Sequence, residues 1–560
     1  MSETTQQPSA KPERFVRHAN LMSGLTMVSR VAGLVRDKTC SYFLGVGTEW
    51  SAFWIGFQFP NLFRRIFGEG ALTAVVVPAY TRLLHQKGQA EANRLASATL
   101  SLLAIVLLAI TVIGECIVLP IAFSENVLPA NRLAAFMVAV MLPYAITICL
   151  VAIMSAIATV HERFVAQSLS PIVLNVAITV GAALGTWVMT TKSPLSERIW
   201  WVACSVLVAG VLQVLMLVPT LQTAGVRVRP TLAFKGSGIG EVIRPMLPMV
   251  IGLAAVQFNT FLDSQIAWWF SPDGHGGAST FMMWGHELTA PMQAGAVGKL
   301  SIAQRIYLLP VGIFGVAMAT AIFPLLARAA ADNNTDELKR LLVAGLKKTL
   351  FLSLPASVGM ILIAKPLITL IYLGGKVTPD DVNRAWWATV FFCGGIWAFE
   401  AQMVLLRVFY VMKDPITPMK VALGAVAVNI CLNLTLIWFL QEGGIALSTT
   451  VAAVLQIVLL LIILRRRLGV LGLRGLAGNF AKGSFATILM VAVGAAVSLV
   501  PLPWDGVAHP TTLDRWLTAA VRLPLIVVAC GMTYLVLARL MGMAELRDVP
   551  FIGRRLMPRG

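Results

Sequence analysis

Charged residues are scarce in this sequence. Asp, Glu, Lys and Arg make up 12% of the 560 residues, whereas hydrophobic residues make up 58% and the mean hydropathy is +0.80. A soluble protein carries about 25% charged residues. The composition therefore excludes an ordinary soluble domain and predicts an all-α polytopic membrane protein.

Paired cysteines and common enzyme motifs are also missing. The seven cysteines stand singly, without CxxC spacing, so we expect no disulfide framework and no metal site built from them. No GxxxxGK[ST], HExxH or GxSxG motif occurs, and GSGIGE at 236–241 does not match GxGxxG. We therefore predict a transporter, not an enzyme, with no cofactor. The membrane potential or a gradient of Na⁺, H⁺ or Cl⁻ would drive it.

Long apolar runs fill most of the chain. A membrane span needs about 20 apolar residues. On that criterion we predict about fourteen spans, at residues 20–46, 50–80, 95–122, 132–158, 168–190, 198–220, 242–270, 300–328, 342–372, 385–410, 417–440, 444–464, 477–500 and 514–540. The first, second, seventh and eighth are the least regular, because polar residues interrupt them.

The formal net charge of +18 does not indicate nucleic-acid binding, because the basic residues lie mostly in short loops between apolar runs. With the N-terminus inside, most Lys and Arg fall on the cytoplasmic side, as the positive-inside rule requires. The outside loops then hold only Arg132, Lys192, Arg198, Lys376, Arg384 and Arg515. This asymmetry predicts a multi-pass membrane protein with an even number of spans and both termini in the cytoplasm.

One outside loop, residues 270–298, is unusually long and has no Lys or Arg. It is rich in glycine, which fits either a small extracytoplasmic flap or a disordered insertion. His275 and His286, with Asp273 and Glu287, form at most a weak metal-binding pattern, and we expect no metal site.

Two segments resemble each other. Residues 66–82 read IFGEGALTAVVVPAYTR, and residues 313–328 read IFGVAMATAIFPLLAR. The match is short and can also arise by chance. If it is a repeat, spans two and eight are six apart, so the repeated units share one orientation, as in parallel transporter repeats.

The repeat suggests a domain division. It comprises a cytoplasmic tail (1–19), an N-lobe with six spans (20–221), a cytoplasmic linker (222–241) and a C-lobe with six spans (242–465), whose outside loop is 271–298. Two more spans (466–541) and a cytoplasmic tail (542–560) follow. The two six-helix lobes would be related by a parallel pseudo-two-fold axis.

Arginines interrupt the first two spans. Arg30 and Arg36 lie in the first, and Arg64 and Arg65 in the second. A central arginine costs a spanning helix about 2.5–3.5 kcal/mol on insertion scales, unless it faces a polar cavity. Arginine is well suited to phosphate oxygens because its planar guanidinium donates two parallel hydrogen bonds. We therefore predict an anion site.

Nearby polar residues would support these arginines. Arg30 and Asp37 are seven apart and share a helix face, so Asp37 can hold one arginine and leave another for substrate. Glu69 can pair with Arg64 or Arg65, and we favour Arg65 as structural and Arg64 as the ligand. Pro60 and Asn61 would break or kink the helix where it lines a cavity.

The C-lobe would contribute further groups. Asp263 lies in a polar stretch with Gln257, and Lys299 and Arg305 begin the eighth span. The alternative is that the charges only pair with one another, as Arg30–Asp37 and Arg65–Glu69, and hold the helices together. Glu400 is a lone acid in an apolar run; either it is an ion site or, as we favour, it lies near a span end.

Several motifs resemble one known family. SRVAGLVRDK, FQFPNLFRRIFGEGALTAVVVPAY, LPMVIGLAAVQFNTFLDSQIA and QRIYLLPVGIFGVAMATAIFPLLAR are similar to segments of the MurJ/MviN family of bacterial lipid II flippases. These belong to the multidrug/oligosaccharidyl-lipid/polysaccharide exporter superfamily. The resemblance implies alternating access between two lobes, a groove at 466–541 for the polyprenyl tail, and pyrophosphate binding by the residues that match the family's cavity arginines: Arg30, Arg36, Arg64 and Arg305.

This chain departs from the family pattern at three places. Gln304 and Ser51 stand where the family often has acidic residues, although Glu49 is near the second, and the 270–298 loop is longer than expected. We predict a flippase for lipid II, the undecaprenyl-pyrophosphate-linked peptidoglycan precursor, that acts in the bilayer with cell-wall synthesis enzymes as possible partners. The alternatives are a flippase for another polyprenyl-linked oligosaccharide and a non-transporting scaffold for cell-wall enzymes.

Overall fold

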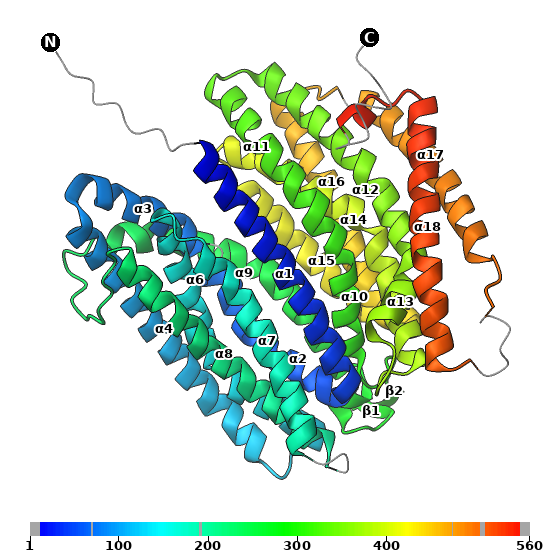
Figure 1. Cartoon of the computed structure of the whole chain (residues 1–560), viewed down its shortest axis with the longest axis horizontal. Helices are drawn as coiled ribbons and strands as arrows, with labels where there is room; N and C mark the ends of the chain where they lie inside the picture. Colours follow the sequence, from blue (N-terminus) through cyan, green and yellow to red (C-terminus); the bar gives the residue numbers. More distant parts are fainter. Residues whose placement is uncertain (1–11, 69–70, 190–192, 473, 504–509, 549–560) are drawn as a thin grey trace. The chain divides into compact units, whose positions relative to one another are not determined.

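The computed structural model describes residues 12–68, 71–189, 193–472, 474–503 and 510–548. Nearly all of this chain is helical (Figure 1). It divides into two compact units: unit 1 comprises Met1–Gly45 and Ala52–Gln257, and unit 2 comprises Val46–Ser51 and Phe258–Gly560. The boundary between the units lies at Gln257, inside the helix Gly240–Trp269, whereas the linker was predicted at 222–241. The short segment Val46–Ser51 belongs to unit 2 although the residues on both sides of it belong to unit 1.

Unit 1 is a helical bundle. Its elements are α1 (Pro12–Leu44), α2 (Thr48–Phe63), the π-helix η1 (Arg64–Gly68), α3 (Ala71–Lys87), α4 (Gln89–Phe123), α5 (Pro129–Met141), α6 (Tyr144–Val160), α7 (Val165–Val188), α8 (Leu195–Thr223) and the first part of α9 (Gly240–Trp269). α7 packs between α1 and α8, and α6 packs on α8 and η1. Small residues allow these contacts: a Cβ at Gly181 of α7 would lie 2.8 Å from the Trp201 carbonyl of α8.

Unit 2 is organised around its longest helix, α12. Its elements are η2 (Pro272–His275), β1 (Thr280–Met283), β2 (His286–Thr289), α10 (Ala296–Pro310), the π-helix η3 (Val311–Gly315), α11 (Val316–Ala331), α12 (Thr335–Tyr372), α13 (Pro379–Gly394), α14 (Ile396–Val411), α15 (Ile416–Leu440), α16 (Glu442–Leu468), α17 (Arg474–Ser498), α18 (Thr512–Leu540) and η4 (Ala544–Asp548). α12 contacts α10, α11, α13, α14, α17 and α18. The Tyr534 hydroxyl of α18 donates to the Phe351 carbonyl of α12 over 2.7 Å, which holds α18 against this central helix.

Each of the fourteen predicted spans coincides with a helix or a broken pair of helices. Ten helices of the described chain are long and apolar enough to cross a membrane, or eleven if the bent pair α13–α14 is one span. The predicted spans outside this set are α1, α2–α3 and α9, three of the four that polar residues interrupt. The count of fourteen therefore stays a prediction, whereas the polytopic helical fold is confirmed.

The two similar sequence segments adopt the same unusual local structure. The IFG at 66–68 ends the π-helix η1, and the IFG at 313–315 ends the π-helix η3. Each π-helix lies between two α-helices of one predicted span. Because π-turns are rare and occur mostly as single turns inside α-helices, frequently at functional sites, a shared π-turn supports a true repeat over a chance match.

Candidate functional site

The arginines of α1 differ in their surroundings. Asp37 is buried, and it accepts from Nε of Arg36 over 2.9 Å and pairs with Nη2 of the same residue at 2.8 Å. Arg30 is exposed. The structure thus pairs Asp37 with Arg36, whereas the alternative named Arg30 as its partner. The carboxylate fixes the position of the Arg36 guanidinium and partly offsets its charge.

The first span is held against α7 where Gly33 lies between these arginines. A Cβ at Gly33 would lie 3.6 Å from Nδ2 of Asn175, and this amide donates to the Ser29 carbonyl over 3.2 Å. Asn175 thus forms a hydrogen bond between helices α7 and α1. This contact fixes the backbone of α1 next to Arg30.

The arginines of the second span lie in the π-helix η1. Pro60 lies inside α2 without ending it, and the wider turn begins four residues later, at Arg64. Nε of Arg64 donates to Oδ1 of Asn61 over 3.3 Å, and Nη1 of Arg65 donates to Oε1 of Gln257 over 3.0 Å. Arg65 thereby connects η1 to α9. Glu69, its predicted partner, lies outside the described residues.

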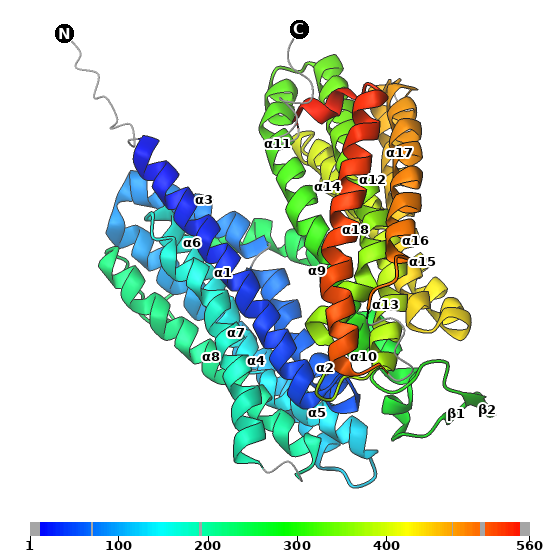
Figure 2. The ribbon, with the colours of Figure 1, turned by 45° about the vertical axis from the view of Figure 1, so that its right-hand side comes forward.

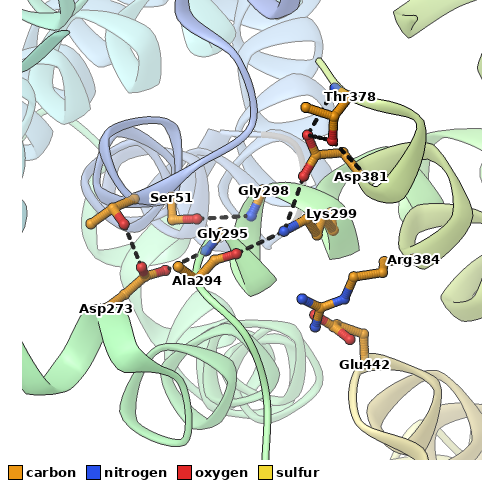
Figure 3. Close-up of polar contacts among 11 residues, drawn as sticks. Ser51, Asp273, Ala294, Gly295, Gly298, Lys299, Thr378, Asp381, Arg384 and Glu442 are labelled. Atoms are coloured by element: carbon orange, nitrogen blue, oxygen red, sulfur yellow. Dashed lines mark hydrogen bonds and ion pairs between the residues drawn. The ribbon is translucent and has the colours of Figure 1, made fainter. Parts of the chain in front are cut away.

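In unit 2, Arg305 is half-buried on α10, six residues before η3 begins. Lys299, one to two turns earlier, is buried. Its ammonium pairs with Asp381 at 3.2 Å and donates to the Ala294 carbonyl over 2.7 Å (Figure 3). The Lys299 side chain is thus held by groups of unit 2, and its predicted support of substrate binding stays a prediction.

Figure 3 shows further polar contacts around the start of α10. The Ser51 hydroxyl accepts from the Gly298 amide over 3.1 Å, and Asp273 accepts from the Thr48 hydroxyl over 2.6 Å and from the Gly295 amide over 2.9 Å. Burial raises the pKa of Asp273. These bonds fasten Val46–Ser51 to the rest of unit 2.

A second charged pair lies beside this network. The Arg384 guanidinium on α13 contacts the Glu442 carboxylate at the first residue of α16, and both side chains are almost fully buried. From the sequence, we assigned Arg384 to an outside loop and did not identify Glu442 as its partner. Their separation along the chain hides the pair, and only the packing of α13 on α16 brings them together.

Asp263 on α9 lies in a buried polar cluster. Its carboxylate accepts from Nδ2 of Asn433 over 2.6 Å and from the hydroxyl of Thr449 at 3.4 Å. With the Asn429 amide turned to satisfy its hydrogen bonds, Nδ2 of Asn429 lies 3.0 Å from Oδ1 of both Asp263 and Asn259.

This cluster has the chemistry of a small-cation site. Oδ1 of Asn433 is buried without a hydrogen-bond partner in the described part of the chain. Carboxylate, amide and hydroxyl oxygens are the ligands that small hard cations prefer. No group of three or more His, Cys, Asp or Glu side chains that could hold a metal occurs among the residues the structure describes.

Glu400 occupies a different environment from the one predicted. It is fully buried in the interior of the α13–α14 pair, so its placement near a span end is wrong. Its Cγ would lie 2.9 Å from a Cβ at Gly315, the last residue of η3. It lies five residues after the nearest break, at Gly395, and the apolar run around it concealed this interior position. Gln402, also on α14, donates a hydrogen bond to Gln456 of α16, which joins these two helices.

Comparisons with known proteins agree with the fold. Residues 40–512 match a family described as lipid II flippase MurJ. A probable lipid II flippase MurJ of Vibrio cholerae is 29% identical over 461 residues, which cover 80% of this chain and 82% of that protein.

Two solved structures are similar in fold. One, a lipid II flippase MurJ in an inward closed conformation, has a TM-score of 0.70 at 22% identity and covers 93% of this chain and 99% of the other. The other, an inward-facing MATE family multidrug resistance transporter of the MOP superfamily, has a TM-score of 0.60 at 16% identity and covers 80% of this chain and 96% of the other.

Proposed function

Because the chain belongs to the MurJ family of lipid II flippases, we propose that it translocates lipid II across the bacterial cytoplasmic membrane for peptidoglycan synthesis. The resemblance seen in the sequence motifs is confirmed by the match over residues 40–512, and this match carries the proposal. Neither another polyprenyl-linked oligosaccharide nor a scaffold role is favoured by any observation.

We propose that Arg30, Arg36 and Arg64 of unit 1 and Arg305 of unit 2 bind the pyrophosphate of the substrate. In unit 1, Asp37 positions Arg36. Bidentate arginine–phosphate bonds are charge-assisted, and several arginines together match the charge of a pyrophosphate. Arg65 would act through its bond to Gln257, keeping η1 against α9.

Charge reversal tests these roles. Arg36→Glu and Arg305→Glu should each fail to support growth and lipid II translocation when the native flippase is depleted, because a carboxylate repels the pyrophosphate. Arg94→Glu is the matched control, since Arg94 is an exposed residue of α4 that pairs with Glu91 on the same helix. Translocation that survives both reversals at normal protein levels would refute the assigned site.

We further propose that the Asp263 cluster couples transport to a small cation such as Na⁺. The support is one buried carboxylate, an orphan amide oxygen and a hydroxyl, contributed by three helices. Cation binding would hold α9, α15 and α16 together, and release would free them. The direction of transport then follows from the cation gradient or the membrane potential, each elementary charge supplying about 2.3 kcal/mol per 100 mV.

The exposed apolar surface of α17 and α18 suits the polyprenyl tail. Ile488, Val528 and Met532 are each more than 60% exposed. We propose that the tail lies along this surface while the head group crosses. Replacing Ile488 and Val528 by serine should weaken binding of the full-length lipid and leave binding of a short-chain analogue unchanged. Equal weakening of both ligands would contradict the proposal.

The orientation with both termini in the cytoplasm is part of the same proposal. The test introduces a single cysteine either at Lys376, in a predicted outside loop, or at Arg229, in the predicted cytoplasmic linker. An impermeant thiol reagent added outside intact cells should react with the cysteine at 376 and not with the one at 229. Reaction at position 229 only would reverse the topology. Contacts with cell-wall synthesis enzymes stay a prediction.

A further inference from the structure

The long loop predicted as a flap or an insertion forms a β-hairpin. β1 and β2 pair antiparallel, with Phe281 opposite Leu288 and Met283 opposite His286. The connecting residues are Trp284 and Gly285. The hairpin is therefore an ordered element of unit 2.

The turn of the hairpin holds a strained tryptophan. Trp284 has φ 51° and Gly285 has φ 82°. A two-residue hairpin turn with positive φ at both positions favours Asn-Gly, and a bulky aromatic residue at positive φ is an outlier. Strained residues of this kind cluster at functional positions. Trp284 is also 90% exposed, so packing within the protein does not explain why it is there.

The inner face of the hairpin is fixed to the ends of two helices. The Phe281 ring stacks on His275 with centroids 4.5 Å apart and meets Phe270 edge-on at 5.9 Å. Phe270, directly after α9, in turn meets Trp438 near the end of α15 edge-on at 6.0 Å. His275 also hydrogen-bonds through Nε2 to the Trp269 carbonyl over 2.8 Å. The base of the hairpin thus lies at the level where these helices end.

That level carries a group of exposed aromatic side chains. Trp269 is 53% exposed and Phe439 82% exposed, at the ends of α9 and α15. α15 is one of the helices long and apolar enough to cross a membrane. Tryptophan gathers where spanning helices meet the lipid head groups, because its ring is apolar and its N–H is polar. These residues therefore mark the membrane interface next to the hairpin.

The direction and composition of the hairpin fit that interface. Figure 2 shows β1 and β2 extending sideways from the lower ends of α10 and α13, across the direction of the helices. A four-residue strand is about 13 Å long. The head-group layer is only about 5–7 Å thick on each side, so the hairpin fits within this layer when its strands lie parallel to the membrane plane. Residues 270–298 contain no Lys or Arg. Met282, on the outer face, is 67% exposed.

From this geometry we infer that the hairpin is a membrane anchor: Trp284 and Met282 insert into the lipid head-group region beside α9 and α15. Its ligand is a phospholipid surface. Insertion places the strained indole where its ring is desolvated and its N–H still finds polar partners. The inserted hairpin would hold the outer ends of α10 and α13 at a constant depth in the membrane. The inference depends on α15 spanning the membrane, not on which lipid-linked substrate is carried.

Quenching of tryptophan fluorescence tests the insertion. The full chain is placed in nanodiscs with or without phospholipids brominated near the head group, and wild type is compared with Trp284→Asn. Asparagine suits the turn, so the variant keeps the hairpin and removes only the indole. Trp268→Phe is the control, because Trp268 is 4% exposed and lies one residue from the interface position Trp269.

The difference signal between wild type and Trp284→Asn reports on Trp284 alone. We expect brominated lipid to remove most of this signal and aqueous iodide to leave it largely unchanged. The Trp268 difference signal should respond to neither. Quenching of the Trp284 signal by iodide but not by brominated lipid would overturn the inference and place the tip in water, where a soluble partner could reach it.

Discussion

The cation dependence of the Asp263 cluster can be predicted in some detail. The carboxylate is 3% exposed, and its described hydrogen-bond donors are uncharged amide and hydroxyl groups. A carboxylate buried without a counter-charge is costly, and a bound cation offsets that cost. A ligand that binds only the folded protein stabilises it by about 2.7 kcal/mol at 100 times its Kd. Wild type should therefore unfold at a higher temperature as Na⁺ replaces choline at constant ionic strength.

Asp263→Asn should remove this dependence, because it takes away the only carboxylate among the residues described in the cluster. The melting temperature of the variant should be the same in Na⁺ and in choline, and Thr449→Val should show a reduced dependence. Asp273→Asn is the matched control: Asp273 is equally buried, but it accepts from Thr48 and Gly295. An unchanged Na⁺ dependence in Asp263→Asn would refute the assignment of the cluster as the coupling site.

Three further changes test the packing. Glu442→Gln should destabilise the protein by about 3–5 kcal/mol, because it leaves Arg384 buried without a charge partner, and the double variant with Arg384→Met should recover most of that loss in a double-mutant cycle. Hydrogen bonds from the Thr417 hydroxyl and amide lower the pKa of Asp414 from 3.8 to about 2. These bonds stabilise the folded protein fully above pH 3.8, and the stabilisation is lost as the pH falls towards 2. Asp414→Ala should therefore lower the free energy of unfolding by about 1 kcal/mol at neutral pH. The difference in this free energy between variant and wild type should shrink in acid. Gly181→Ala should lower the melting temperature by overpacking against α8, at a cost of about 1–3 kcal/mol.

Hydropathy predicted the helices well because each span is a local property of about 20 residues. The arginines of α1 and η1 were also visible locally, as charges in apolar runs. Their partners were less predictable. Asp37 pairs with its neighbour Arg36, although Arg30 shares its helix face, because face periodicity does not describe contacts between adjacent side chains. Arg65 reached Gln257, which lies 192 residues away in the chain.

Contacts between distant helices decided the rest. Asp263 was selected as a polar residue in a span, but its partners on α15 and α16 depend on helix packing that periodicity does not encode. The same holds for the pair Arg384–Glu442, because a count of basic loop residues assigns Arg384 to solvent and does not identify Glu442. The shared IFG predicted a repeat but not the π-turn, since no simple residue pattern specifies that geometry.

The most direct test of the account is a lipid II translocation assay with the purified protein in liposomes. Fluorescent lipid II is placed in one leaflet, and its arrival in the other is measured by its accessibility to a membrane-impermeant quencher. Wild type and Arg94→Glu should move lipid II at similar rates, whereas Arg36→Glu and Arg305→Glu should move it no faster than empty liposomes. Transport by both reversed variants at the wild-type rate, or none by the wild type, would contradict the account.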